Sequence, residues 1–514
     1  MTPSRNLRLL PLLFVFVLAC SFAQAQRAPL RGFDAYVTKT LQEWGCPGLA
    51  IAIVSDDKVV LSKGYGVRKL GESATVDEHT LFGIASCSKA FTAAALGMLV
   101  DEGKIRWDDR AINYLPGFEL YDPYVTREIT IRDLLCHRSG LPAFGGDLMW
   151  WGSTRETNEI LQRARFVKPV SSFRSKYAYQ NIMFIAAGAV IPAVTGKTWS
   201  DFVAERILTP LGMNSSLTKI PVPGQVENLA TPHIRIDGTT KPIAWRDNDN
   251  GAGAVGVNSN VLDLARWIRL QLGRGVFEGK RFYSADVAKE MWSPQTIVPI
   301  SESTPPLPSF LKPRWSAYGL GWAVSEFRGN VVVRHYGETD GMSSVVALMP
   351  EKNLGVVILA NLHTTSLHTA LVYRIFDVFL GIRPQDWSTL YLKVRTNGEL
   401  KEREDRKKQE EARAKTSTPS LPLDKYAGTY QNELYGEATV AQENGKLVVR
   451  LSSSPTYVTN LEHWQFDTFL SRWRDPVAGT TYVSFNLNSR GNVDEMKVNV
   501  DSYIDSGEYT FSKK

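Results

Sequence analysis

The sequence predicts an α+β domain followed by a small all-β domain. In the first region, strand-like runs lie at both ends and helical periodicity fills the middle. Beyond Leu421, short alternating runs are separated by turn residues, as in a small barrel. A chain of 514 residues is also too long for one ordinary domain. We expect a first domain at 27–385, a charged helix and linker at 386–420, and the barrel at 421–514.

The elements of the first domain follow from their periodicity. Leu49–Val60 alternates around the turn pair Asp56-Asp57, which predicts a β-hairpin. Apolar residues at helical spacing predict five helices, at Ser86–Gly103, Ile131–His137, Ile182–Val194, Trp199–Leu208 and Val261–Leu272. Runs rich in β-branched residues near the end predict three strands, at Val331–His335, Ser344–Met349 and Leu354–Ala360.

The connection to the second domain is marked by charge. Lys401–Lys415 is almost wholly charged and predicts a solvated helix. Residues 416–420, Thr-Ser-Thr-Pro-Ser, are typical of a flexible linker. In the barrel region, Lys446–Leu451 and Thr481–Leu487 alternate as strands do. We therefore expect a spacer that joins two separately packed units.

The N-terminal residues have the pattern of a secretory signal peptide, at 1–25. Arg5 and Arg8 precede the apolar run Leu9–Cys20, and the small-x-small triplet Ala23-Gln24-Ala25 follows. We expect an exported protein, periplasmic or secreted. Two alternatives stay open: the run remains as a membrane anchor, or lipidation at Cys20 tethers the protein to a membrane.

Composition excludes some other classes. The net charge of +6 is small for this length and gives no nucleic-acid footprint. Without Cys20 the chain has three cysteines, Cys46, Cys87 and Cys136, so at least one thiol is free. No metal-ligand spacing such as HExxH or CxxC occurs, and we expect no metal and no cofactor.

One Ser-x-x-Lys pattern stands out by its context. The pattern occurs four times, at Ser55, Ser86, Ser216 and Ser309, so the spacing alone is uninformative. Only Ser86 opens a predicted helix, where positions three apart are neighbours and Lys89 can reach the hydroxyl. A serine hydroxyl needs such a base to act as a nucleophile. The alternative is a serine N-cap with a surface lysine.

The residues around Ser86 resemble a known family. Residues 80–92, TLFGIASCSKAFT, are similar to the nucleophile segment of the serine β-lactamase and penicillin-recognising superfamily, above all its class C-like branch of D,D-carboxypeptidases, D-aminopeptidases and esterases. Further matches occur in order at Leu134–Leu141, Pro210–Met213 and Gly251–Gly253. The resemblance implies a β-lactamase/transpeptidase-like fold, an antiparallel sheet flanked by helices with a helical subdomain.

The resemblance implies two further catalytic motifs. Tyr179-Gln180-Asn181 matches the Tyr-x-Asn motif. By the resemblance, Tyr179 would help Lys89 to deprotonate Ser86, and Asn181 would orient Lys89 or bind a substrate carbonyl. Tyr179 could act as a base only if a positive charge, for which Lys89 is the natural source, lowered its pKa from about 10. The alternative for Tyr179 is a half-buried aromatic residue with a bonded hydroxyl.

The third motif is placed at His335-Tyr336-Gly337, after the strand that ends at Arg334. The family pattern implies that Gly337 lets the backbone approach the substrate and that the amides of Ser86 and Glu338 form the oxyanion hole. Histidine is mostly neutral near pH 7, unlike the lysine usual in this motif. Arg334 would lie on the opposite strand face. This weakens the case for a potent β-lactamase and leaves peptidase, carboxypeptidase and esterase open.

Other features are interpreted as structural, or have more than one interpretation. His137 lies in the family's Leu-Leu-x-His segment, where it more often fixes a loop than acts in catalysis. Loops at Gly145–Thr154 and Ser301–Arg314 are expected to line the groove. Residues 426–430, YAGTY, begin a region that resembles the lipocalin-like barrel appended to some relatives, where it covers the active site, contacts a subunit or stays passive.

Together these observations predict an exported serine hydrolase that cleaves an amide or ester bond through an acyl-enzyme on Ser86. The expected substrates are small peptides, esters or β-lactam-like molecules. The alternatives are a true β-lactamase and a non-catalytic penicillin-binding sensor on the same fold. The sequence does not indicate an oligomeric state.

Overall fold

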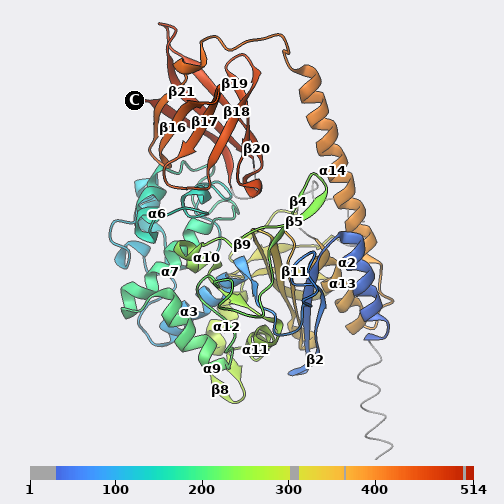
Figure 1. Cartoon of the computed structure of the whole chain (residues 1–514). Helices are drawn as coiled ribbons and strands as arrows, with labels where there is room; N and C mark the ends of the chain where they lie inside the picture. Colours follow the sequence, from blue (N-terminus) through green and yellow to red (C-terminus); the bar gives the residue numbers. More distant parts are fainter. Residues whose placement is uncertain (1–29, 301–311, 364–365, 502–504) are drawn as a thin grey trace, which may run out of the picture.

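The computed structural model describes residues 30–300, 312–363, 366–501 and 505–514 (Figure 1). The predicted signal peptide, Cys20 and most of the Ser301–Arg314 loop lie outside the described residues. The first domain, the long helix α14 (Trp387–Ala412) and the C-terminal barrel follow one another along the chain.

An eight-stranded antiparallel sheet forms the centre of the first domain, in the order β2-β1-β14-β13-β12-β11-β10-β9. Its strands are β1 (Gly48–Ser55), β2 (Lys58–Gly66), β9 (Thr296–Ile297), β10 (Ser316–Tyr318), β11 (Ala323–Phe327), β12 (Asn330–Thr339), β13 (Met342–Met349) and β14 (Leu354–Ala360). The predicted hairpin is confirmed: Asp56 and Asp57 both have positive φ, which fits a tight two-residue turn between β1 and β2.

Helices cover both faces of this sheet, which explains why its central strands are apolar throughout. Along β1, Leu49, Ile51 and Ile53 pack with one face. That face is covered by α2 (Phe33–Trp44), α13 (Leu367–Phe379) and the start of α14 (Trp387–Ala412). The alternate residues of β1 pack with the other face, covered by α3 (Lys89–Asp101), α11 (Val261–Leu272) and α12 (Ala285–Trp292).

A helical subdomain packs beside α3. It contains α4 (Pro123–Glu128), α5 (Ile131–Leu134), α6 (Thr157–Arg163), α7 (Asn181–Thr195), α8 (Trp199–Val203), α9 (Thr209–Leu211) and α10 (Ala252–Val255). Two-stranded pairs join β3 (Phe82–Gly83) to β6 (Asn258–Ser259), β4 (His233–Ile236) to β5 (Thr239–Pro242), and β7 (Val276–Phe277) to β8 (Lys280–Arg281).

Two helices of this subdomain differ from their predicted bounds. The helix predicted at Ile131–His137 ends at Leu134, because His137 takes a φ of 59° that no right-handed helix allows. The helix predicted at Trp199–Leu208 changes after Val203 into a π-helical turn, Ala204–Leu208. Among the described helices no single one is long and apolar enough to cross a membrane, and only α7 with the segment Trp199–Leu211 meets that test, as a pair bent by 80°.

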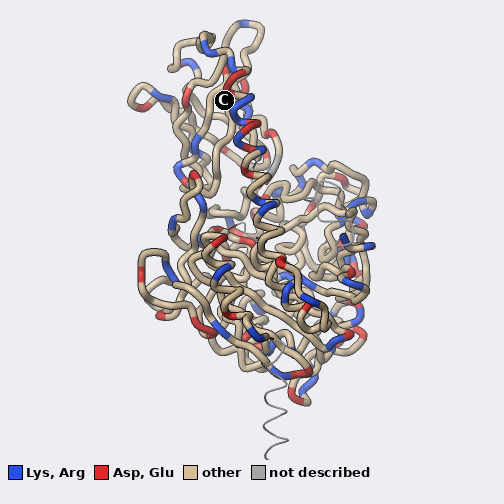
Figure 2. The backbone as a smooth tube through the Cα atoms, turned by 90° about the vertical axis from the view of Figure 1, so that its right-hand side faces the viewer, with Lys and Arg blue, Asp and Glu red and all other residues tan. Residues whose placement is uncertain are grey.

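The helix α14 runs along the side of the molecule from the sheet to the barrel (Figure 1). Charges of both signs alternate along it, as Figure 2 shows, which agrees with the predicted solvated helix. It begins at Trp387, well before the predicted charged run, because its first turns pack on the sheet layer through Trp387 and Tyr391.

The C-terminal region is a closed eight-stranded barrel, which confirms the predicted small all-β barrel domain. Its strands are β15 (Gly428–Asn432), β16 (Gly436–Glu443), β17 (Lys446–Leu451), β18 (Val458–Gln465), β19 (Thr468–Trp473), β20 (Thr480–Leu487), β21 (Val493–Asp501) and β22 (Ser506–Lys513). The segment between α14 and the barrel is held by hydrogen bonds, from Phe466 N to Ser417 Oγ at 3.0 Å and from Ser420 Oγ to Asp467 at 2.8 Å. These bonds order a segment whose composition is typical of a flexible linker.

Candidate active site

Ser86 lies in a short turn between the sheet and α3. The residues Ala85–Ser88 form a 3₁₀ turn, and α3 begins only at Lys89, so the predicted helix start at Ser86 is wrong by three residues. Ala85 has a φ of 47°, which is unusual for a residue with a side chain and holds the backbone sharply bent just before Ser86. The strain is localised at the residue before the candidate nucleophile.

Hydrogen bonds from the sheet hold this turn in place. Ser344 Oγ on β13 donates to the carbonyl of Ile84 at 2.8 Å. The thiol of Cys87 donates to the carbonyl of His335 on β12 at 3.2 Å. Gly337 makes the approach of β12 possible, because a Cβ there would lie 2.0 Å from Ile84 O and 2.3 Å from Ser344 Oγ. The lack of a Cβ at Gly337 therefore leaves room for the turn Ala85–Ser88, which we call the nucleophile turn.

Lys89 is buried and points at Ser86. Its side chain has no exposed surface, and Nζ lies 2.9 Å from Ser86 Oγ, 2.7 Å from Asn181 Oδ1 and 3.2 Å from the carbonyl of Ala254. Burial lowers the pKa of Lys89 to about 7, although the charge of Asp147 acts in the opposite direction. A neutral amine has two N–H bonds and one lone pair. Since Asn181 Oδ1 and the Ala254 carbonyl can only accept, they take the two N–H bonds, and the lone pair is left to face the Ser86 hydroxyl.

Tyr179 lies beside the same pair. Lys89 Nζ is 4.9 Å from the centre of the Tyr179 ring. Burial raises the pKa of Tyr179 well above 10, and a hydrogen-bond contact with Ser86 opposes that shift only in part. The phenol is therefore protonated near pH 7. The expectation that the charge of Lys89 lowers this pKa is not met, because burial of the phenol has the largest effect and raises it.

Asn181, at the start of α7, connects Lys89 to a residue that the sequence reasoning missed. Its Oδ1 accepts from Lys89, while its Nδ2 donates to Asp147 Oδ2 at 2.5 Å. Asp147 is 1% exposed, and its other oxygen accepts from Trp150 Nε1 at 2.9 Å. Both ends of the Asn181 amide are thus engaged, and the amide orients Lys89, which was one of its two expected roles.

His335 lies inside β12, which continues to Thr339 and so contains the whole third motif. Its Nδ1 bonds to the carbonyl of Tyr336 at 2.6 Å, so Nδ1 carries the proton, and Nε2 accepts from the hydroxyl of Tyr318 at 2.7 Å. Burial lowers the pKa of His335 to about 3. Both ring nitrogens are engaged in a neutral ring, and Arg334 on the opposite face bonds to Tyr373.

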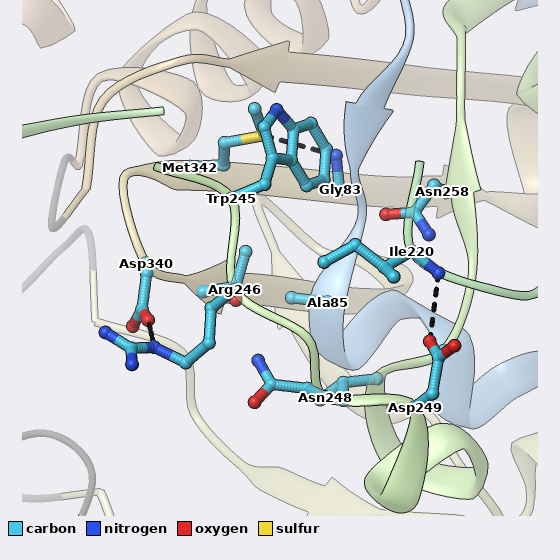
Figure 3. A pocket seen from close by; sticks show the side chains of 13 residues that line it. Gly83, Ala85, Ile220, Trp245, Arg246, Asn248, Asp249, Asn258, Asp340 and Met342 are labelled. Carbon is cyan, nitrogen blue, oxygen red and sulfur yellow. Dashed lines mark hydrogen bonds and ion pairs between the residues drawn. The ribbon is translucent and has the colours of Figure 1, made fainter. Parts of the chain in front are cut away.

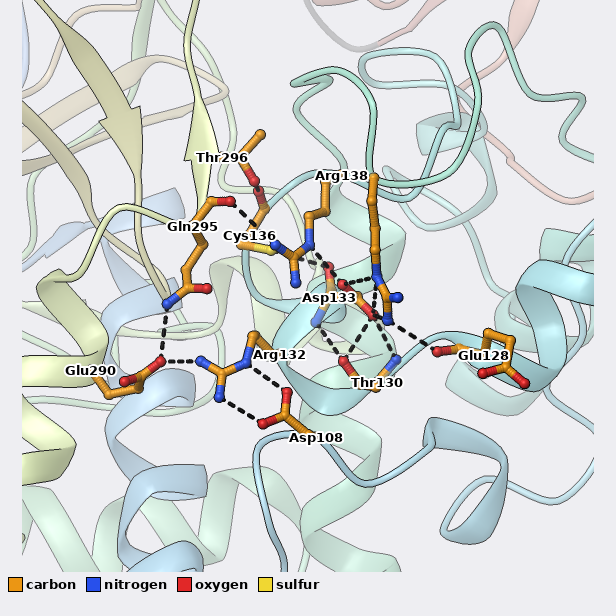
Figure 4. A network of polar contacts seen from close by, with 11 residues as sticks. Asp108, Glu128, Thr130, Arg132, Asp133, Cys136, Arg138, Glu290, Gln295 and Thr296 are labelled. Carbon is orange, nitrogen blue, oxygen red and sulfur yellow. Dashed lines mark hydrogen bonds and ion pairs between the residues drawn. The ribbon is translucent and has the colours of Figure 1, made fainter.

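His137 is a buried structural histidine in this arrangement. Its Nδ1 accepts from Gln180 N at 2.9 Å, and its ring lies 4.2 Å from that of Tyr179. The segment before it is anchored by Asp133, which accepts from Arg138 at 2.6 Å and from Arg174 at 2.7 Å (Figure 4). Burial opposes ionisation of Asp133, but these bonds hold its pKa below the usual value. The network thus fixes the loop that positions Tyr179.

A pocket opens next to the nucleophile turn (Figure 3). Its lining includes Ala85, Trp245, Arg246, Asn248 and Thr339. Arg246 is an ion-paired cation there: it bonds to Asp340 and, at 2.5 Å, to Asp475 of the barrel. Its guanidinium also stacks on Trp151 at 3.9 Å.

The groove loop Gly145–Thr154 turns out to hold its two tryptophans inside. Trp150 is 6% and Trp151 2% exposed, so they support the groove and do not line it.

The side chain of Glu338 is exposed on β12. Cys46, Cys87 and Cys136 are all buried free thiols. The described ranges contain no group of three His, Cys, Asp or Glu side chains that could hold a metal ion.

The structure thus brings Ser86, Lys89, Tyr179 and Asn181 into one cluster, with His335 and Gly337 on the strand behind the turn. The arrangement can activate a hydroxyl nucleophile with a buried amine. Asp147 and Tyr318 were missed because no motif marks them. The only sequence signal for Asp147 is an acid in a loop rich in Gly and Trp.

Comparison with known proteins shows the family to which the chain belongs. The family model "Beta-lactamase" matches residues 33–378, and the chain belongs to this family. It is a hydrolase of the β-lactamase/transpeptidase-like superfamily. A second model, a domain of unknown function named DUF3471, matches residues 412–513. Membership of the class C-like branch and the lipocalin likeness of the barrel stay predictions.

Named relatives extend the comparison. The chain is 32% identical to "Unguisins hydrolase ungD'" of Aspergillus campestris, over 79% of this chain and 77% of the relative. It is 30% identical to "Penicillin-binding protein 4" of Amycolatopsis lactamdurans, over 68% of this chain and 89% of the relative. The solved structure of an octameric penicillin-binding protein homologue from Pyrococcus abyssi shares the fold, with a TM-score of 0.62, 21% identity and coverage of 94% of this chain and 100% of that one.

Proposed function

We propose that this protein is a serine hydrolase that cleaves an amide or ester bond through an acyl-enzyme on Ser86. The observation that carries the proposal is the contact of 2.9 Å between Ser86 Oγ and a buried Lys89 amine whose pKa is about 7. A base whose pKa lies near the working pH is the most effective general base.

The reaction would begin with attack of Ser86 Oγ on the substrate carbonyl carbon, while the hydroxyl proton moves to Lys89. The phenol of Tyr179 donates its proton to the leaving nitrogen or oxygen as the carbonyl–heteroatom bond breaks. The Lys89 ammonium then returns a proton to Tyr179. Water releases the acyl group by the same steps in reverse, and the protonation states at the start are restored. The backbone amides of Ser86 and Glu338 are the proposed oxyanion donors.

The surroundings of Ser86 favour substrates without a free carboxylate next to the scissile bond. His335 is neutral with both nitrogens bonded, Arg334 lies on the other face, and Arg246 is paired with two aspartates. None of these three side chains, which are the candidates nearest to the third motif, therefore offers an unpaired positive charge to the site. Esters and internal amide bonds fit this site better than β-lactams or C-terminal dipeptides. The name of the hydrolase relative from Aspergillus fits an amide or ester hydrolase.

Turnover of a short-chain nitrophenyl ester by the purified protein, compared with that by Ser86→Ala, tests this proposal. We expect the variant to lose at least about 10³-fold in kcat while it unfolds at the wild-type temperature. Full activity of Ser86→Ala would overturn the assignment. A parallel assay with a penicillin and with its methyl ester tests the preference against carboxylates, and we expect the ester to acylate faster.

We also propose export through the signal peptide at residues 1–25, with lipidation at Cys20 as the alternative. Mass spectrometry of the mature N-terminus separates the two: cleavage after Ala25 leaves Gln26 first, whereas lipidation leaves a modified Cys20 first.

A further inference from the structure

We propose that the C-terminal barrel positions Lys89, because the barrel holds the loop that carries Asp147, and Asp147 in turn orients Asn181 and Lys89. This inference rests on the proposed role of Lys89 as the base for Ser86. It assigns a role in the reaction to a domain that matches only a family of unknown function. Asp147 and Tyr509 are positioning residues in this scheme, since neither touches Ser86 in the contacts described.

The chain of contacts begins where the barrel docks. The barrel contacts the catalytic domain along the segment 146–163, which includes the Gly145–Thr154 loop. Ser454 Oγ donates to Gly152 O at 2.5 Å, Thr154 N donates to Ser453 O at 3.0 Å, and Arg155 Nη2 donates to Tyr435 O at 2.5 Å. Part of this segment is therefore held against the barrel.

The innermost of these contacts reaches Gly146. The hydroxyl of Tyr509 lies near the backbone of Gly146 and donates to Asp505 Oδ1 at 2.8 Å. The other carboxyl oxygen of Asp505 accepts from Tyr435 at 2.5 Å. Gly146 has a φ of 84° and precedes the 3₁₀ turn Asp147–Met149, so its position sets where the Asp147 side chain points.

Asp147 then decides how the Asn181 amide is turned. An amide has an accepting end and a donating end of nearly the same shape, and it can sit either way round. Both oxygens of Asp147 accept N–H bonds, from Asn181 Nδ2 and from Trp150 Nε1. This forces Asn181 to present Oδ1 to Lys89. With the amide reversed, its NH₂ group would face the Lys89 amine, and the lone pair of Lys89 would turn away from Ser86.

The two buried groups also feel one another's charge. The charge of Asp147 raises the pKa of Lys89 against the effect of burial, and burial raises the pKa of Asp147 itself, with Asp505 contributing. The other titratable groups that face this pair are Cys87, Tyr179, His137 and His335. Of these, the two histidines are neutral near pH 7 because their pKa values are lowered by burial, and burial keeps Cys87 and Tyr179 protonated.

Two substitutions at Asp147 separate its charge from its shape. Asp147→Asn keeps an accepting oxygen and removes the charge, so we expect a moderate loss of kcat. We also expect the acidic limb in the pH profile of kcat/KM to move to lower pH. Asp147→Leu removes the acceptor, and we expect a larger loss of kcat, of about 10–100-fold, with KM little changed. Equal kcat for both variants and the wild type, with the limb in place, would overturn the role of Asp147.

The barrel's part is tested with Tyr509→Phe in the full chain, because it removes the hydroxyl that lies near Gly146 and donates to Asp505. We expect kcat to fall by about 3–10-fold, with the limb moving as in Asp147→Asn. The matched control is Tyr430→Phe, which removes a buried barrel hydroxyl bonded at 2.7 Å to Tyr426 O within the barrel. If Tyr509→Phe and Tyr430→Phe leave kcat equally unchanged, the barrel does not position Lys89.

A measurement without catalysis keeps this inference distinct from the proposed function. A double-mutant cycle between Asp147→Asn and Tyr509→Phe, read as the free energy of unfolding, should show coupling between the two residues, whereas the cycle of Asp147→Asn with Tyr430→Phe should not. Coupling without acylation of Ser86 would leave the contact chain standing and refute the hydrolase proposal. Absence of coupling in an active enzyme would refute only the chain.

Discussion

Acidification should switch the enzyme off through Lys89. The proposed mechanism needs the neutral amine, and the pKa of Lys89 is about 7. The neutral fraction is then about one half at pH 7, about one tenth at pH 6 and about one hundredth at pH 5. We expect kcat/KM, which reports the free enzyme, to fall about 5-fold from pH 7 to pH 6 and about 50-fold from pH 7 to pH 5.

The sign follows from which form of each group reacts. Below the pKa Lys89 is protonated, has no lone pair for Ser86, and activity is lost; above it activity levels off. No fall on the basic side is expected below about pH 10, because the pKa of Tyr179 is raised well above that value. His335, with a pKa of about 3, does not contribute in this range.

The assay is the pH dependence of ester turnover in buffers of constant ionic strength, with unfolding followed in parallel. The variant Asp147→Asn should keep a limb, displaced to lower pH. A flat profile between pH 5 and pH 8 would refute the reasoning, and so would a limb that only appears above pH 9, where an ordinary lysine titrates.

Two further predictions concern stability. Lys89→Met should abolish activity yet stabilise the fold. The pKa of Lys89 is about 7 in the folded protein and near 10.5 in the unfolded chain, so burial of the charged amine costs up to roughly 5 kcal/mol below pH 7. In thermal melts the variant should therefore unfold at a higher temperature than the wild type, by a margin that shrinks as the pH rises towards 10.5. Gly337→Ala should lower the free energy of unfolding by about 2–4 kcal/mol in urea melts, because its Cβ would collide with Ile84 O. The control is Gly398→Ala in the exposed part of α14, where an added Cβ would meet no neighbouring atom within 4 Å. This control should raise the free energy of unfolding by about 0.5–1 kcal/mol.

Much of the fold was predictable because local patterns dictate it. The bounds of α11 and β14 agree with their predicted ranges, because α11 is strongly periodic, β14 is an unbroken apolar run, and Gly273 and Asn361 follow them. The start of α3 was not predictable from periodicity. The backbone at Ala85 is held in a positive-φ conformation by contacts with β12 and β13, and such tertiary contacts leave no mark in the local sequence.

The site was predictable where a motif names the residue and unpredictable where burial sets the chemistry. Ser86, Lys89, Tyr179 and Asn181 could be placed from their motifs. The order of the pKa values could not, because it depends on the full burial of Lys89, on the partial burial of Tyr179 and on the position of Asp147, 34 residues from Asn181 in sequence. The contact of the barrel with the Gly145–Thr154 loop likewise brings together residues that are some 300 positions apart.

The central claim is an acyl-enzyme on Ser86. The most direct test is the intact mass of the protein after brief incubation with an acylating ester or a penicillin methyl ester, followed by peptide mapping, for the wild type and Ser86→Ala. The account predicts one acyl group per wild-type chain, on the peptide that contains Ser86, and none on the variant. An adduct of equal amount on Ser86→Ala, or ester turnover by a wild type that reacts at another residue, would contradict it.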